Sequence, residues 1–339
     1  MLVSAAVIPH GDFAVDPTLL PTGSKSRVKA EALNTASMDT ASTLLTLVDK
    51  IVLITPHGLA ADEDLAIYLG VRGSGYAPIG RDAGNDGHGK CWNLPLHGVV
   101  MDDARAKCLR DFLRASDTSG NKVSGLTSYG GYADTPLRYG EVIPLSFFLG
   151  RTESEDHDWV MVNTKEEEGE GYDLTRGKSN PPCIILSLPN RRYTEGPNMV
   201  DEMLRIGADL AKYLDSIPDR FALVVSADLA HTHESSGPYG YSPAAQPFDD
   251  ACAAWARDLD GPPLLETARE LLSDAKSCGY LGLVILHGAL NELASKGNDA
   301  NLGNSWQCKL HTISHPTYYG MMVSSYIRQR FPSFSTKQK

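Results

Sequence analysis

Four polar residues, of types that bind metals or move protons, lie at the ends of apolar, β-branched segments. His10 and His57 each end one segment. Asp228 and His231 lie at the end of a third, and the segments are residues 2–10, 51–57 and 221–231. Two neutral imidazoles and one anionic ligand would leave open positions on a divalent metal for water, oxygen or a chelating substrate. A carboxylate or a thiolate could complete this set, so the residue types predict a mononuclear metal site.

The two histidines that end the first two segments share nearly the same local sequence. Residues 8–11 read Ile-Pro-His-Gly, and residues 55–58 read Thr-Pro-His-Gly. Proline ends the pairing of a strand, and glycine lets the backbone turn sharply. A single histidine at a strand end is as often a hydrogen-bonding residue as a ligand. The duplication favours paired metal ligands at His10 and His57.

Other polar residues near these segments have weaker candidate roles. His233 lies two residues after His231, and in an extended chain both rings would share one face at different depths. We therefore expect only one of the two to reach the metal. Asp228 is expected to orient a histidine or a water from behind the ligands. His311 and His315 stand close to a Tyr-Tyr-Gly sequence and are candidates for lining a pocket rather than for binding metal.

The three apolar segments have the composition of buried parallel strands, and segments with helical periodicity separate them. Polar residues that follow such strands meet at one edge of an open sheet, which would bring distant histidines together. The predicted fold is α/β, with a mainly parallel or mixed central sheet flanked by helices and the metal site at the carboxyl ends of the strands. Helices are expected at residues 26–46, 199–214, 247–258, 264–276 and 278–293, and a strand or a helix at 318–327.

The chain of 339 residues is predicted to fold as a single catalytic α/β domain over residues 1–339. Two stretches are interpreted as loop excursions. One lies near residues 70–90 and is rich in glycine and aspartate, and the other lies near residues 153–178 and carries an acidic run. Candidate ligands lie on both sides of each excursion, so neither resembles a domain linker.

Composition excludes several classes of partner. The formal net charge of -11 argues against nucleic acid, whose phosphates require a basic face. No apolar run approaches the roughly 20 residues of a membrane span, and the first ten residues lack the features of a signal peptide. The six cysteines form no CxxC pair, which favours reduced thiols. We therefore expect a cytoplasmic protein without a membrane partner.

Five short motifs are spread over most of the chain. They are VIPHGD at 7–12, ITPHG at 54–58, YGEVIPL at 139–145, VVSADLAH at 224–231 and SCGYLGLVILHGAL at 277–290. In this order they resemble the class III extradiol ring-cleavage dioxygenase superfamily, meaning the catalytic chain of the protocatechuate-type enzymes and its Memo-like relatives. Each motif alone is weak, and the shared order makes the resemblance fairly specific.

The resemblance implies roles for individual residues. In the ring-cleaving members the first two motifs supply histidine ligands, which places them at His10 and His57. The fourth motif supplies the catalytic histidine for proton transfer, hence His231. Their metal is Fe(II), which binds both catechol oxygens and O2. The implied partners are a small aromatic substrate and O2, and a homodimer is implied because relatives often self-associate.

The chain departs from the motifs of the ring-cleaving enzymes at two positions of the predicted metal site. The ring-cleaving enzymes use a glutamate as third ligand, whereas the aligned residue here is Cys278, as in the Memo-like branch. A thiolate is softer than a carboxylate and shifts preference towards zinc, copper or a differently tuned iron. Glu266 and Glu270 are the alternative third ligands. Tyr139 stands where the third motif usually carries a histidine, which removes one hydrogen-bonding partner for substrate or oxygen.

These features support three functional hypotheses. The first is an extradiol-type dioxygenase that cleaves a catechol-like substrate with O2, with Fe(II) favoured and zinc or copper as alternatives. The second is a Memo-like metal-binding, redox or peptide-binding protein without ring cleavage, which Cys278 favours. The third is a zinc-dependent hydrolase or lyase in which His231 would shuttle protons.

Overall fold

The computed structural model describes residues 1–80, 91–115, 122–128, 133–149, 152–153, 159–160, 180–295 and 305–329. Its centre is an eight-stranded sheet in the order β12-β13-β1-β11-β2-β10-β3-β6. The strands are β1 (Leu2–Ile8), β2 (Lys50–Thr55), β3 (Leu65–Tyr68), β6 (Val123–Leu126), β10 (Cys183–Ser187), β11 (Phe221–Ser226), β12 (Trp306–Ser314) and β13 (Met321–Arg328). The predicted α/β class is confirmed.

The central strands of this sheet are parallel. β11 pairs with β1 on one side and with β2 on the other, and β2 also pairs with β10. Towards its edges the sheet is mixed, because β13 runs antiparallel to β1 and β3 runs antiparallel to β10. The carboxyl ends of β1, β11 and β2 therefore lie next to one another at one edge of the sheet.

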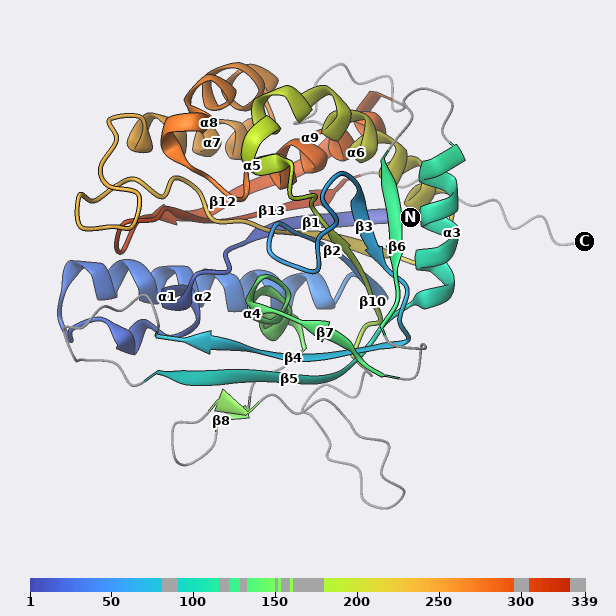
Figure 1. Ribbon diagram of the computed structural model, residues 1–339, viewed down its shortest axis with the longest axis horizontal. Helices are drawn as coiled ribbons and strands as arrows, with labels where there is room; N and C mark the ends of the chain where they lie inside the picture. The colour runs from blue at the N-terminus through green and yellow to red at the C-terminus, as the bar shows by residue number, and fades with distance from the viewer. Residues whose placement is uncertain are drawn as a thin grey trace, which may run out of the picture.

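Helices cover both faces of the sheet (Figure 1). One face carries α6, α7, α8 and α9 together with α3 and α5, and the other carries α1, α2 and α4. Their bounds are α1 (Asp12–Val15), α2 (Lys25–Leu45), α3 (Asp103–Ala115), α4 (Tyr139–Phe148), α5 (Arg192–Glu195), α6 (Val200–Asp215), α7 (Ala245–Asp258), α8 (Arg269–Ala275) and α9 (Tyr280–Ser295). The described residues also include two 3-10 turns, η1 (Pro17–Leu19) and η4 (Gly196–Met199), and a π-helix, η5 (Pro263–Ala268).

The helices predicted from the sequence are confirmed, with two refinements. The helix expected at 264–276 begins as the π-helix η5 before it continues as α8, and the segment at 318–327 contains the strand β13. Within the described ranges, every helix is too short or too polar to cross a bilayer.

Side chains alternate along the buried strands and thereby build two apolar cores, one on each face. Along β1, Val7 packs into one core and Ile8 into the other, and along β2 Ile54 and Leu53 divide in the same way. Because both faces are covered, these strands are continuous apolar runs in the sequence. The two cores hold the carboxyl ends of the strands in fixed register.

A three-stranded sheet packs on the outer side of α4 (Figure 1). Its order is β5-β4-β7, with β4 (Arg72–Ile79), β5 (Trp92–Val100) and β7 (Thr135–Leu137). The prediction of a loop near residues 70–90 is therefore wrong for the part that forms β4. The backbone of this strand pairs with β5 and β7, and its Ala77 and Ile79 are buried.

The remaining part of the first excursion, residues 81–90, lies outside the described residues. Of the second, residues 153–178, the structure describes only parts of the short pair β8 (Thr152–Glu153) and β9 (Trp159–Val160).

Candidate metal centre

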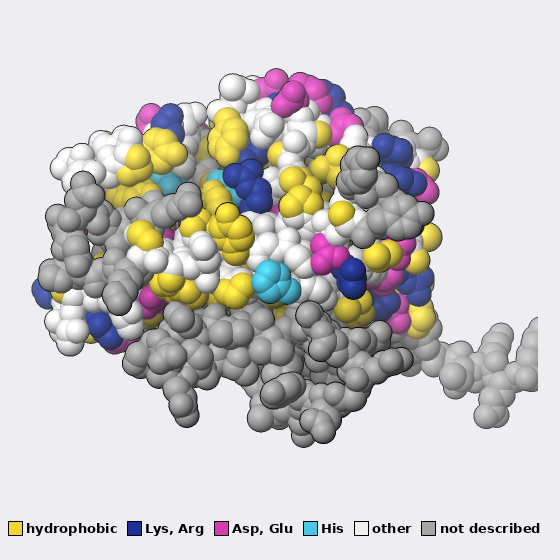
Figure 2. All heavy atoms as spheres, turned by 60° about the horizontal axis from the view of Figure 1, so that its bottom comes forward, with side chains coloured by type: hydrophobic (Ala, Val, Ile, Leu, Met, Phe, Trp, Pro, Cys, Tyr) yellow, Lys and Arg dark blue, Asp and Glu magenta, His cyan; other side chains and the backbone are white. Residues whose placement is uncertain are grey.

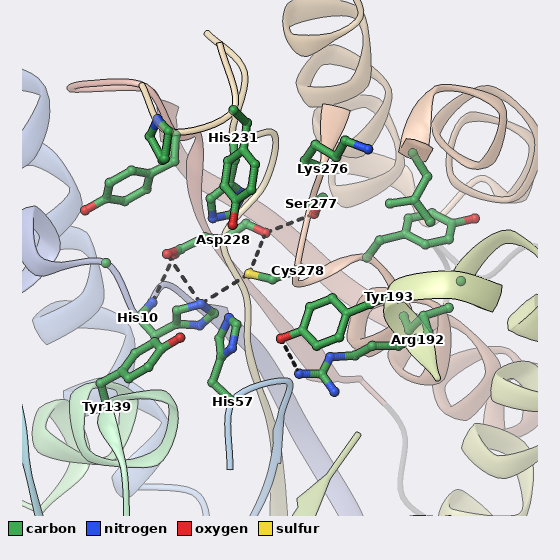
Figure 3. A pocket seen from close by; sticks show the side chains of 18 of the residues that line it. His10, His57, Tyr139, Arg192, Tyr193, Asp228, His231, Lys276, Ser277 and Cys278 are labelled. Atoms are coloured by element: carbon green, nitrogen blue, oxygen red, sulfur yellow. Dashed lines mark hydrogen bonds and ion pairs between the residues drawn. The ribbon is translucent and has the colours of Figure 1, made fainter. Parts of the chain in front are cut away.

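Three neighbouring parallel strands deliver polar residues to one edge of the sheet. His10 follows β1, Asp228 follows β11 and His57 follows β2. Cys278 reaches the same place from the turn that precedes α9 (Figure 3). The ligand atoms of His10, His57 and Cys278 all lie within 4.8 Å of one another. These three residues form a group that could hold a metal ion.

Ser226, at the end of β11, fixes the imidazole of His10. Its hydroxyl donates to the carbonyl of Gly140 at 2.7 Å, and its oxygen lies 2.9 Å from Nδ1 of His10. Since the hydroxyl has only one proton to donate, Nδ1 of the neutral ring carries the proton and Nε2 keeps its lone pair. Nε2 of His10 faces the thiol of Cys278 and lies 3.3 Å from its Sγ. The ring is therefore oriented with its metal-binding atom toward the other ligands.

Both candidate imidazoles are neutral. Burial is the main cause that lowers the pKa of His10, and the neighbouring His57 and His231 lower it further. Burial also lowers the pKa of His57 to about 3, with an additional effect from the guanidinium of Arg192. A neutral imidazole offers a lone pair that a protonated ring lacks, so these surroundings suit metal binding.

Asp228 contacts both His10 and the turn that carries Cys278. Its Oδ1 accepts the backbone N–H of His10 at 3.1 Å, and its Oδ2 lies 3.4 Å from Nε2 of the same residue. The Asp228 carbonyl accepts the Ser277 hydroxyl at 3.0 Å and the Gly279 N–H at 3.1 Å, which fixes the turn that carries Cys278. Because His10 is neutral, the contact with Oδ2 is not an ion pair.

The thiol of Cys278 is the anionic donor of this group only when it loses its proton. Burial, assisted by the nearby Asp228, raises the pKa of this thiol. A divalent cation among the three ligand atoms would stabilise the thiolate, so metal binding would release a proton. The softness of sulfur makes this donor set suitable for iron or zinc.

The glycines that follow the two histidines are required by close packing. Neither Gly11 nor Gly58 is among the glycines with positive φ. A Cβ on Gly11 would lie 2.3 Å from the ring of Tyr319, and a Cβ on Gly58 would lie 2.4 Å from the carboxylate of Glu141. The backbone bends at both glycines, as the sequence interpretation expected, and the missing side chain also leaves space beside the candidate ligands.

Ser226→Ala is expected to weaken metal binding about tenfold to a hundredfold, because Nδ1–H of His10 loses the acceptor that orients the ring. Competition with a chromophoric chelator measures the affinity. Ser4→Ala is the matched control, since Ser4 is a buried serine of β1 whose hydroxyl has no hydrogen-bond partner among the described residues. Equal affinities for the two variants would remove Ser226 from the ligand framework.

His231 presents a second neutral base to the same pocket. Its Nδ1 lies 2.8 Å from the carbonyl oxygen of Leu229, which can only accept, so Nδ1 carries the proton of the neutral ring. Burial lowers the pKa of His231 to about 4, although backbone hydrogen bonds at Leu229 and Lys276 raise it. The ring stacks on Tyr319 with centroids 5.8 Å apart. At neutral pH this side chain can accept a proton.

The other candidate histidines lie away from this pocket. Nε2 of His233 is 2.8 Å from Oδ2 of Asp249, and its ring stacks on His315 with centroids 4.1 Å apart. Of the neighbouring pair, only His231 lines the pocket. The candidate pocket-lining role of His311 and His315 is wrong, because neither lines it. Both lie on the chain before β13, and their rings contact other polar groups.

The two alternative third ligands do not approach the centre. Glu266 lies on η5 and Glu270 on α8, and both are exposed. Neither lines the pocket or belongs to the group that could hold a metal. Among the described residues, the geometry favours Cys278 over these glutamates.

The candidate centre opens into a pocket with a volume of about 790 Å³. Half of the 14 tyrosines of the chain line it, which makes its walls aromatic: Tyr76, Tyr139, Tyr193, Tyr239, Tyr280, Tyr318 and Tyr319. Three cationic residues also line it, namely Arg138, Arg192 and Lys276. Figure 2 shows hydrophobic side chains around a hollow in which histidine and basic side chains are visible. Asp12 and Asp228 line the pocket as well, so the aromatic walls carry charges of both signs.

Arg192, at the start of α5, places a positive charge at the pocket wall (Figure 3). Its hydrogen-bond acceptors within the described part of the chain are neutral oxygen atoms: the carbonyls of Pro56, Leu188 and Pro189, and the hydroxyl of Tyr193. These partners bind its two terminal nitrogens without neutralising the guanidinium. Its place at the pocket could not be predicted from the sequence, because nothing in its local sequence separates it from the adjacent arginine.

Glu141 is a buried carboxyl group behind the candidate centre. The hydroxyl of Tyr68 donates to its Oε1 at 2.6 Å, and the backbone N–H of Arg138 donates to its Oε2 at 3.0 Å. Burial raises the pKa of Glu141 to about 7, although these hydrogen bonds lower it. Its folded-state pKa therefore lies above the value of 4.5 for an unperturbed group.

The stability of the wild type relative to Glu141→Gln is expected to be greatest below about pH 4.5 and to fall as the pH rises. The fall should end near pH 7 and amount to roughly 3 kcal/mol, since the unfolded chain ionises before the folded protein does. Urea unfolding of both proteins across this range measures the difference. A difference that does not change with pH would contradict the raised pKa.

Comparison with known proteins gives little functional information. No family model matches the sequence. Over 96 residues, 28% of this chain, the sequence is 27% identical to Protein CA_C1420 of Clostridium acetobutylicum, and the match spans 20% of that protein's length. The fold is similar to the crystal structure of uncharacterized protein JW3007 from Escherichia coli K12, with a TM-score of 0.43 and 16% identity over 95% of this chain and 99% of that one. The side chains of the site are therefore the basis for a function.

Proposed function

We propose that this protein is a metal-dependent extradiol-type dioxygenase that cleaves an aromatic diol with O2, and that its metal is Fe(II). The observation that carries the proposal is the convergence of His10, His57 and Cys278 beside the neutral base His231 in one tyrosine-lined pocket. Two imidazoles and one anionic donor leave open positions for a chelating diol and for O2. The ordered motifs support the same reaction by resemblance.

Different residues would bind the metal and accept the proton in this reaction. His10, His57 and Cys278 would hold Fe(II), which when bound supplies the electron transfer between the diol and O2. Nε2 of His231 would accept a proton from a diol hydroxyl, which leaves an anionic oxygen that chelates better. Both atoms of O2 enter the ring-opened product, so no external reductant is consumed.

The electrostatics of the pocket support an ionised aromatic ligand. The carboxylate of Asp228 is directed to His10 and to the ligand framework, whereas among the described residues the guanidinium of Arg192 donates to neutral oxygen atoms. A cation that is not neutralised by the protein stabilises an anion bound nearby. The aromatic side chains would stack against the ring of the diol.

The direct test is oxygen uptake by anaerobically prepared protein loaded with Fe(II) and supplied with a series of catechols. We expect one O2 to be consumed for each diol, with a new absorption band from the ring-opened product. Protein loaded with Zn(II) serves as the control and should consume none. Fully loaded Fe(II) protein that consumes no O2 with any of the diols would contradict the proposal.

A zinc-dependent hydrolase or lyase is the second candidate function, and Cys278 is the observation that favours it. Thiolate and imidazole are usual zinc ligands, and an open coordination position would activate water. His231 would then move protons to and from the reacting group. Tight zinc binding together with hydrolytic turnover and no oxygen uptake would select this function over the first.

A further inference from the structure

Tyr139, the first residue of α4, packs against both candidate histidine ligands. The centroid of its ring lies 4.9 Å from that of His57 and 5.9 Å from that of His10. Figure 3 shows its hydroxyl directed toward these rings, with Tyr139 and His231 on opposite sides of the pair His10 and Cys278. The phenol therefore borders the space that a ligand at the metal would occupy.

The start of α4 is held to both histidines, so the position of this phenol is well defined. The carbonyl of Gly140 accepts the hydroxyl of Ser226, which also contacts Nδ1 of His10. A Cβ on Gly140 would lie only 2.8 Å from Cβ of His57, so the helix approaches the end of β2 as closely as its backbone allows. Tyr139 is thus positioned by the same contacts that position the ligands.

The hydroxyl of Tyr139 is available to a ligand. Within the described ranges, no protein group forms a hydrogen bond with it, whereas the buried hydroxyls of Tyr68 and Tyr280 both have protein acceptors. Tyr139 is half-buried and lines the pocket, so its hydroxyl can reach a ligand bound there. A phenol carries one O–H, which it can donate to an anionic oxygen.

We propose that Tyr139 is a catalytic residue that donates a hydrogen bond to the ionised oxygen of an aromatic diol bound at the metal centre. The inference rests on the proposed function, and it assigns different roles to His231 and Tyr139. His231 accepts the proton that the diol releases, and Tyr139 keeps its own proton and stabilises the resulting oxygen anion. The tyrosine thereby supplies the donor that was expected to be absent at this motif position.

The test uses 4-nitrocatechol, a diol whose absorption band moves to longer wavelength when it ionises. It is titrated anaerobically into protein loaded with Fe(II), so binding and ionisation are read without turnover. In Tyr139→Phe we expect binding to weaken about tenfold to a hundredfold and the bound band to move to shorter wavelength. Tyr241→Phe is the matched control, because this exposed phenol does not line the pocket and its loss should change neither quantity.

Elemental analysis shows whether each variant keeps its metal, and Tyr139→His provides a second variant that restores an N–H donor. Recovery of part of the affinity in Tyr139→His would support the role. Unchanged affinity and an unchanged band in metal-loaded Tyr139→Phe would overturn it while leaving the proposed function intact. No binding of the diol to metal-loaded wild type would overturn both.

Discussion

Cys278→Ala is expected to lose its bound metal, with metal affinity reduced at least about a hundredfold. A residue that binds the metal directly contributes more to this affinity than the residues that orient the ligands. The ligand atoms of His10, His57 and Cys278 lie within 4.8 Å of one another, and the variant would leave two imidazoles without an anionic donor. His57→Ala should behave in the same way. Elemental analysis of anaerobically purified and desalted protein gives the metal content of each variant.

Cys308→Ala is the matched control for this experiment, since Cys308 is also half-buried but lies on β12 outside the pocket. It should keep a full complement of metal. If Cys278→Ala also kept it, the thiolate would not be the third ligand. Asp228 would then become the leading alternative, because its Oδ2 lies 3.4 Å from Nε2 of His10, whereas Glu266 and Glu270 are exposed and remote from the pocket.

The sequence was sufficient to predict the elements that carry the two histidines of the candidate metal site. β1, β2 and β11 are covered on both faces, so they are unbroken apolar runs that stand out from their surroundings. Because parallel strands end at a common edge, the residues that follow them, His10, His57 and Asp228, could be grouped before the sheet order was known. The three strands are in fact immediate neighbours.

The walls of the pocket could not be predicted in the same way. Arg192 and Tyr193 follow a turn after β10, and Tyr318 and Tyr319 precede β13, so each position depends on how distant segments pack. β4 was mistaken for a loop because its glycines obscure the alternation by which an amphipathic strand is recognised. Tertiary pairing with β5 and β7 overrides this weak local signal.

The position of Cys278 also depends on tertiary contacts that its local sequence does not reveal. The sequence supplies a cysteine before an apolar helix, which is equally typical of a small buried side chain. What brings it to the centre is the carbonyl of Asp228, which accepts hydrogen bonds from both Ser277 and Gly279. Contacts to a backbone carbonyl leave no trace in residue type, so Cys278 could be proposed as the third ligand only from the resemblance.

His231→Gln is expected to keep its metal but to lose catalytic activity by about a hundredfold to ten-thousandfold, the usual contribution of general acid–base catalysis. In the wild type, Nδ1 of His231 is tied to the carbonyl of Leu229, so the proton accepted from the substrate must go to Nε2. Glutamine can still accept a hydrogen bond but cannot take up a proton. Steady-state oxygen uptake with the best catechol, combined with metal analysis, measures the loss.

The pH profile separates this role from simple loss of packing. Burial holds the pKa of His231 near 4, so the acidic limb of kcat/KM for the wild type should lie well below the ordinary histidine value of 6.5. This limb should be absent from the residual activity of His231→Gln. His311→Gln, which changes a half-buried histidine outside the pocket, should keep both the rate and the profile of the wild type. Full activity in metal-loaded His231→Gln would show that another group accepts the proton.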